Sequence, residues 1–240
     1  MNVCYQDPLY LQLREVIRAK IETGEYPLCV ALPSEYEMAE QYGINRRTVH
    51  NAYNALIQEG ILHQVPGRGV FVLGKKVERN LDELSGFHQT MLEKQVVPSV
   101  KVLYRKLRHA GAYYGAMFGL LPDDGLFEIK RVCYADDAPV SIEEIYVPQY
   151  LIPKLSGIDL SVFSVYEVYD IYGIQLQRAE QELCLTHLDQ KDARTLEIDA
   201  SLAVMKFESI SYDTRGRTIE FNRNYVRGDK CNFTVHFQNC

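Results

Sequence analysis

The sequence predicts an α+β fold in two parts: a small helical part that ends in a β-hairpin, and a larger antiparallel sheet with helices packed against it. Two observations predict it. A helical hydrophobic period runs to Gly60, and strand-like alternation joined by hairpin turns follows beyond Phe127. The 240 residues are 47% hydrophobic and 24% charged, which is ordinary for a globular chain and excludes collagen-like, low-complexity and fully disordered classes.

The formal charge is distributed unevenly between the two parts. The chain carries a net charge of −6, but residues 1–76 contain eight Lys or Arg and eight Asp or Glu, so the whole excess lies in residues 77–240. A neutral first part can bind a polyanion if its basic side chains cluster on one face. The charge pattern therefore permits a nucleic-acid partner that the total charge alone would disfavour.

The first element is expected to be a helix, because apolar residues recur with a 3.6-residue period. Pro8 at its start and Gly24 after its end fit the usual asymmetry of helix termini. The apolar stripe consists of Leu9, Leu13, Val16, Ile17 and Ile21.

Two further helices are expected on either side of a glycine turn. Ser34 is a predicted N-cap with Glu37 completing a capping box, and the helix should run to about Tyr42. Gly43 then breaks the chain, and Asn45 caps a third helix that ends at Gly60. Helix, tight turn and helix is the spacing of a helix-turn-helix. The third helix has an apolar stripe of Val49, Ala52, Tyr53, Leu56 and Ile57.

A hairpin is expected directly after the third helix. Short strand-like runs at 61–65 and 70–73 flank Pro66, Gly67, Arg68 and Gly69, a glycine-rich tip. A hairpin in this position reads as the wing of a winged helix. Residues 75–84 lose hydrophobic periodicity and are predicted to be a linker between a first domain at 1–74 and a second at 85–240.

The second part is expected to be an antiparallel sheet with helices on it. Strand-like runs at 127–132 and 142–147 bracket the turn from Asp136 to Pro139, and runs at 203–212 and 218–226 bracket a turn containing Gly216. Cys231, Phe233, Val235 and Phe237 also alternate with polar residues. Helices are expected at 111–119, 162–172 and 187–196.

The cysteines and the hydropathy argue against a metal site and against a membrane span. The six cysteines show no Cys-x-x-Cys pair, and no His stands at zinc spacing, so we expect free thiols and no metal or other cofactor. No run approaches the roughly 18 apolar residues of a membrane helix. The first residues lack the basic start and apolar stretch of a secretory signal, so a cytoplasmic location without a membrane partner is expected.

Several motifs in the first part occur in an order that resembles the winged helix-turn-helix of GntR-type bacterial transcription regulators. Each motif is weak alone, but six in register over one segment are strong. They are Pro8-Leu9-Tyr10, Leu32-Pro33-Ser34-Glu35, Arg46-x-Thr48-Val49, Glu59-Gly60-Ile61-Leu62, Gly67-x-Gly69 and Phe71-Val72.

The second part resembles the UTRA effector domain of the HutC-type branch of that family, which has a chorismate-lyase-like fold. The resemblance implies a dimeric, ligand-responsive regulator of a two-fold symmetric DNA operator. The matching pieces are Arg131 ahead of Asp136-Asp137-Ala138-Pro139, Glu143-x-x-Tyr146-x-Pro148, Ser164-x-Tyr166-Glu167, Tyr172-Gly173-Ile174 and Tyr225-x-Arg227-Gly228-Asp229.

A recognition helix presents donors to base edges from its N-terminal turn. Arg46 holds the family's base-reading position, Thr48 suits a phosphate contact, and Arg68 is placed to enter a minor groove. His50 and Tyr36 stand where the pattern has basic residues, which predicts a different operator. The alternatives to DNA contact are purely structural. The basic residues could form only a solvated helix face, and Ser34 and Glu35 could serve only as helix caps. The DNA-facing set is Ser34, Glu35, Tyr36, Asn45, Arg46, Arg47, Thr48, His50, Gly67, Arg68 and Gly69.

The resemblance also implies an effector pocket. Many UTRA domains hold a phosphate with two arginines separated by one residue, whereas this chain has Arg131-Val132-Cys133, so a phosphate clamp should be weaker. Alternation places Arg223, Tyr225 and Arg227 on one strand face. A structural salt bridge is the alternative for Arg131, and for Arg227 with Asp229. The expected effector residues are Phe87, His88, Arg131, Cys133, Glu143, Ser164, Tyr225 and Arg227.

The sequence thus predicts a regulator, by analogy a repressor, whose operator affinity is controlled by a small polar or anionic metabolite such as a sugar, sugar phosphate or carboxylate. Two alternatives stay open at this point. One is an enzyme of lyase-like fold, although no catalytic residue can be named; the other is a ligand-independent DNA-binding protein.

Overall fold

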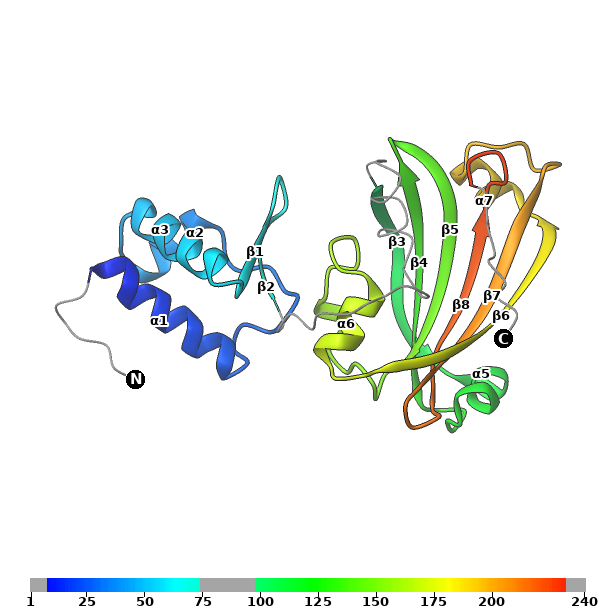
Figure 1. Cartoon of the computed structure of the whole chain (residues 1–240), viewed down its shortest axis with the longest axis horizontal. Coiled ribbons are helices and arrows are strands. Elements are labelled where there is room, and N and C mark those ends of the chain that lie inside the picture. Colours follow the sequence, from blue (N-terminus) through cyan, green and yellow to red (C-terminus); the bar gives the residue numbers. More distant parts are fainter. Residues whose placement is uncertain (1–7, 74–97, 232–240) are drawn as a thin grey trace, which may run out of the picture. The chain divides into compact units, whose positions relative to one another are not determined.

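The α+β class is confirmed by the computed structural model of the chain, which describes residues 8–73 and 98–231 (Figure 1). The chain divides into two compact units, residues 1–80 with 157–163, and residues 81–156 with 164–240. The predicted linker at 75–84 and the alternating residues Phe233, Val235 and Phe237 lie outside the described residues.

The first unit contains the three expected helices, α1 (Leu9–Glu22), α2 (Glu35–Tyr42) and α3 (Arg46–Gln58). Their ends follow from local chemistry. Ser34 and Glu37 form the predicted capping box at the start of α2, and Gly43 ends that helix in the left-handed conformation with φ of 63°. The Asn45 side chain accepts a hydrogen bond from the backbone N–H of Arg47 and caps α3.

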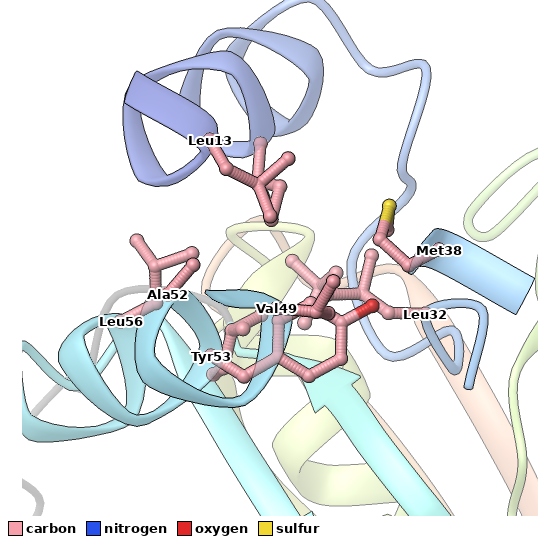
Figure 2. Packing of buried hydrophobic residues seen from close by; sticks show 10 residues of the cluster. Leu13, Leu32, Met38, Val49, Ala52, Tyr53 and Leu56 are labelled. Carbon is pink, nitrogen blue, oxygen red and sulfur yellow. The ribbon is translucent and has the colours of Figure 1, made fainter. Parts of the chain in front are cut away.

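One apolar core holds these helices together. Leu13 and Ile17 of α1 pack with Met38 of α2 and with the inner face of α3. Figure 2 shows the Leu13 side chain turned toward α3. The antiparallel hairpin of β1 (Leu62–Val65) and β2 (Gly69–Val72) follows α3, as predicted for a wing. The buried face of α3 consists of Val49, Ala52, Tyr53 and Leu56.

The second unit is built on a six-stranded sheet in which every neighbouring pair is antiparallel, in the order β3-β4-β5-β8-β7-β6. Two hairpins, β4–β5 and β7–β8, lie side by side at its centre because β5 pairs with β8. The strands are β3 (Pro98–His109), β4 (Gly125–Ala135), β5 (Ala138–Pro148), β6 (Leu176–His187), β7 (Ala203–Asp213) and β8 (Thr218–Val226).

Helices cover both faces of this sheet. On one face, α5 (Gly111–Phe118) packs on Leu126, Tyr146 and Phe221, and α7 (Gln190–Thr195) packs on Val132 and Ile142. On the other face, α6 (Val165–Ile171) places a side chain against β8. Because side chains alternate along each strand, these two faces hold different sets of residues.

Candidate DNA interface and effector site

The N-terminal turn of α3 exposes the polar side chains that were predicted to face DNA. Arg46, Arg47 and His50 lie on the solvent side of the helix, while Val49 points into the core. The Arg46 side chain is 72% exposed. The same sequence pattern that buries one stripe of α3 therefore leaves a row of donors on the opposite stripe.

Glu35 at the start of α2 organises this row. Its carboxylate accepts hydrogen bonds from Arg46 Nε at 3.0 Å and from His50 Nδ1 at 2.7 Å, and Asn54 Nδ2 lies 2.9 Å from His50 Nε2. Burial raises the pKa of Glu35, but the hydrogen bonds from His50 and Arg46 outweigh it and the net pKa is lowered. Glu35 is thus an anion that holds two predicted base-reading side chains.

The remaining predicted residues of α2 and α3 differ in exposure. Ser34 and Asn45 both serve as helix caps, and Thr48 is half-buried. Tyr36 is 70% exposed on α2.

The tip of the wing is open as expected. Gly67 and Gly69 adopt φ of 72° and 117°, and each leaves free space where a Cβ atom would stand. Arg68 is exposed at that tip and donates a hydrogen bond to Ser161, which belongs to the same compact unit.

In the second unit, β4 and β5 bring three of the predicted effector residues together. Arg131 is directly opposite Glu143, and its Nε lies 2.5 Å from Glu143 Oε2. Both side chains are buried, with exposed fractions of 9% and 5% for the residues. Cys133 lies beside them, fully buried; burial and the nearby Glu143 raise the pKa of its thiol, so the thiol stays neutral.

Burial lowers the pKa of Arg131, but the attraction of Glu143 outweighs it and the net pKa is raised. Arg131 therefore stays charged beside Glu143. Such a pair costs desolvation energy, which its mutual attraction and further hydrogen bonds must offset. A buried pair of this kind adds little stability by itself, and ionisable groups with shifted pKa values are enriched at functional sites.

The strand β8 adds residues to this face that sequence reasoning missed. Pairing of Glu143 with Asn224 and of Ile145 with Asn222 places the even-numbered residues of β8 beside the Arg131–Glu143 pair. Glu220 follows on the same face and is 1% exposed. Burial raises its pKa to about 7.

The helix α6 supplies the partner of Glu220. The Tyr169 hydroxyl donates to Glu220 Oε2 at 3.1 Å, and it also lies 3.3 Å from the carbonyl oxygen of Ile219. This contact fixes one carboxylate oxygen and leaves the other, Oε1, in the interior. The sequence contains a signal for this face, because the polar residues Glu220, Asn222 and Asn224 occupy alternate positions. The prediction selected the bulkier odd-numbered residues of β8, which lie on the opposite face.

Tyr225 lies on the opposite face of the sheet. Tyr225 pairs with Ile142 and packs in the cluster under α7, on the opposite side of the sheet from Arg131. Arg223 is partnered there by Glu208 at 2.7 Å and by Glu144 at 3.3 Å. The expectation that Tyr225 lines one pocket with Arg131 and Glu143 does not fit the register of the sheet.

Arg227 and Ser164 have structural partners. The guanidinium of Arg227 donates to the carbonyl oxygens of Pro139 and Leu196 and to Asp229, the salt bridge that was the alternative for this residue. Ser164 caps α6, and its capping box with Glu167 uses both its hydroxyl and its backbone N–H. Helix capping accounts for Ser164, and the carbonyl and carboxylate partners account for Arg227. The predicted residues Phe87 and His88 lie outside the described part of the chain.

A capped helix that exposes arginines, a glycine-tipped wing and a separate sheet domain together define a helix-turn-helix DNA-binding protein with a second domain. The family model described as bacterial regulatory proteins, gntR family, matches residues 9–72, and that of the UTRA domain matches residues 93–232. The chain belongs to the GntR family and carries a UTRA domain. It is a DNA-binding transcription regulator, which sets the enzyme alternative aside.

Two relatives and one solved structure illustrate the likeness. The HTH-type transcriptional repressor NagR of Bacillus subtilis is 32% identical over 239 residues, 99% of this chain and 98% of that protein. The mannosyl-D-glycerate transport/metabolism system repressor MngR of Escherichia coli is 27% identical over 228 residues, 95% of each chain. PhnF from Mycobacterium smegmatis shares the fold, with a TM-score of 0.63 at 21% identity, covering 96% of this chain and 99% of that one.

None of the helices within residues 8–73 and 98–231 is both long and apolar enough to cross a bilayer. Among the described cysteines, Cys133 is a buried free thiol and Cys184 an exposed one.

Proposed function

We propose that this regulator is a repressor that binds a two-fold symmetric operator as a homodimer and releases it when a small polar metabolite binds the UTRA domain. Base reading is assigned to Arg46 and His50, positioning to Glu35, and minor-groove contact to Arg68. The effector site is assigned to the sheet face around Arg131 and Glu143.

The observation that carries the effector assignment is the buried Arg131–Glu143 salt bridge with Glu220 on the same sheet face. Buried charged groups that serve no packing purpose cluster at binding sites. The relative MngR is named for a mannosyl-D-glycerate system, and such a molecule carries many hydroxyl groups and a carboxylate. A polar metabolite of that general kind fits a face lined by charged and amide side chains.

The experiment selects operators from random duplex DNA with the full chain and then compares variants on the selected site. Arg46→Ala removes a side chain able to make a bidentate contact with guanine, which is worth about 1–3 kcal/mol of base discrimination. We therefore expect the ratio of operator to random-sequence affinity to fall by about 5- to 150-fold. Arg178→Ala, on β6, is the matched control and should leave that ratio unchanged.

Two outcomes contradict the proposal. Selection that enriches no duplex sequence would remove the DNA-reading assignment as a whole. An Arg46→Ala variant that keeps the full preference would show that another side chain reads the bases. Sedimentation of the protein with and without the selected duplex measures the homodimer, and one protomer per full operator would contradict it.

A further inference from the structure

The polar face of α3 continues one turn beyond the residues to which base reading has been assigned. Arg46, His50 and Asn54 follow one another at intervals of four residues, so their side chains are neighbours on one face of the helix. The amide nitrogen of Asn54 lies 2.9 Å from His50 Nε2, and His50 Nδ1 lies 2.7 Å from Glu35 Oε1. Asn54 therefore ends a series of hydrogen bonds that starts at the Glu35 carboxylate.

The charge of Glu35 fixes the direction of each hydrogen bond in this series. Burial raises the pKa of Glu35, but the hydrogen bonds from His50 and Arg46 outweigh burial, so the carboxylate is an anion that only accepts. His50 Nδ1 must then carry the proton that it donates to Glu35. The other ring nitrogen, Nε2, accepts from the Asn54 amide, which is the arrangement of a neutral imidazole. Both ring nitrogens of His50 are thus engaged, and a base reaches either of them only by displacing a partner.

The hydrogen bond to His50 also fixes which way the Asn54 amide faces. One N–H is held by His50 Nε2, and turning the amide over would bring Oδ1 against that acceptor instead. Within residues 8–73 and 98–231, the second N–H and Oδ1 of Asn54 have no other side-chain hydrogen bond. Asn54 therefore holds one acceptor and one donor side by side, in a fixed order, on the face that carries Arg46.

This pair of atoms matches the major-groove edge of adenine. Adenine presents the N6 amino donor beside the N7 acceptor, and an asparagine amide binds both at once, whereas guanine presents two acceptors and one of them would face Oδ1. Recognition helices read bases with side chains about seven positions apart, so the reach is adequate. Arg46 and Asn54 are eight positions apart on α3, about 12 Å along the helix axis, which corresponds to about three or four base pairs.

We propose that Asn54 is a further base-reading residue, which selects adenine in each half-site within about four base pairs of the guanine read by Arg46. His50 and Glu35 hold its amide in the reading orientation. The proposal rests on the proposed function, because it concerns the same DNA surface, and it adds a residue and a base to it. The alternative is an ordinary hydrogen bond between helix neighbours, which stabilises α3 and reads nothing.

The test compares base preferences at single positions of the selected operator. Selection with the full chain gives the operator, and Arg46→Ala identifies the guanine that Arg46 reads. Each A·T pair within about four base pairs of that guanine is then replaced in turn by the other three pairs. At one of these positions we expect the wild type to favour adenine by about 5- to 150-fold and Asn54→Ala to bind all four duplexes nearly equally. Gln58→Ala, which removes an exposed amide one turn further along α3, is the control and should keep the preference.

Three results would overturn the proposal. They are a loss of affinity in Asn54→Ala that is uniform over the four duplexes, an adenine preference that Asn54→Ala retains, and an operator with no preferred A·T pair in that range. Asn54→Asp is a second variant of nearly the same shape, and it replaces the donor and acceptor by two acceptors. Adenine should then lose its advantage and cytosine, whose N4 amino group donates, should gain. An Asn54→Asp chain that still favours adenine would contradict the assignment.

Failure of this inference is distinguishable from failure of the proposed function. A selection that enriches no duplex removes DNA reading as a whole, and this role of Asn54 with it. An operator whose guanine depends on Arg46, but whose other positions are indifferent to Asn54, leaves the proposed function standing and overturns this inference alone.

Discussion

At the scale of single residues, Glu220 makes the free energy of unfolding depend on pH. Its pKa is about 7 in the fold against 4.5 for an ordinary glutamate, and burial is the main cause. The groups around it are Tyr169 and Tyr166 of α6, Arg131, Glu143 and Asn222, and burial together with the negative charge of Glu143 outweighs the hydrogen bonds and the attraction of Arg131.

The sign of the stability change follows from this raised pKa. Below about pH 4.5 the carboxyl is protonated in both states; as pH rises toward 7 the unfolded chain releases its proton first, so the free energy of unfolding falls. The full loss is about 3 kcal/mol. Glu220→Gln should flatten that slope, as measured by denaturant unfolding at about pH 5 and pH 8, whereas the exposed control Glu182→Gln should keep it. A wild-type slope in the Glu220→Gln variant would contradict this origin.

Glu35 is central to the proposed DNA interface. It holds both Arg46 and His50 although it carries the same charge sign as the DNA backbone. In that proposal its role is to orient donors, at some cost in electrostatic attraction.

Glu35→Gln should raise affinity for random duplex and lower discrimination for the operator. Removing an anion near the phosphates favours any DNA, and a neutral amide with one acceptor oxygen can no longer hold both donors. Fluorescence anisotropy with operator and random duplex at one salt concentration measures the ratio. Glu40→Gln, on the same helix, makes the same charge change away from Arg46, and an equal effect there would reduce the result to charge alone.

At the scale of elements, the helices of the first unit were predictable because each carries its own end signals. The capping box of Ser34 and Glu37 and the cap at Asn45 are written in consecutive residues, and the structure has both. The hairpins β4–β5 and β7–β8 were predictable for a similar reason, since buried central strands show long apolar runs beside a turn.

The edge strands β3 and β6 were missed, and exposure explains why. Side chains such as Leu103, Leu107, Leu183 and Leu185 are exposed among charged residues, so the alternation is broken over much of both strands. The expected helix at 187–196 accordingly begins later, as α7 at Gln190, because β6 extends to His187. The choice of face on β8 failed for a different reason: alternation gives two faces, and only the register with β5 shows which one meets Arg131.

Substitutions at Ser164 test whether its hydroxyl caps α6 or binds a ligand. The structure gives its hydroxyl to the backbone N–H of Glu167 at 3.1 Å, the N-cap contact of α6. Ser164→Ala should lower the free energy of unfolding by about 1 kcal/mol, and Ser164→Asp should restore it because aspartate also caps helices. Denaturant unfolding of the full chain measures both. If Ser164→Asp is as unstable as Ser164→Ala, the hydroxyl acts on something other than the helix end.

At the scale of the whole molecule, control of DNA by a metabolite requires a free energy that links the two domains. Such couplings are typically about 1–3 kcal/mol, which changes affinity by about 5- to 150-fold. In a symmetric dimer this suffices, since the two recognition helices must match half-sites about one helical turn or a multiple apart.

Linkage also makes the coupling reciprocal, and this gives a prediction that needs no structure of the complex. The factor by which the effector weakens operator binding must equal the factor by which operator weakens effector binding. Calorimetry of effector binding with and without saturating operator, and anisotropy of operator binding with and without saturating effector, measure the two factors. The double variant Arg131→Gln/Glu143→Gln removes the buried salt bridge without leaving one charge alone, and both factors should then approach one. Unequal factors in the wild type would mean that the effector acts on an additional species, such as the monomer, because a single linked equilibrium allows no other result.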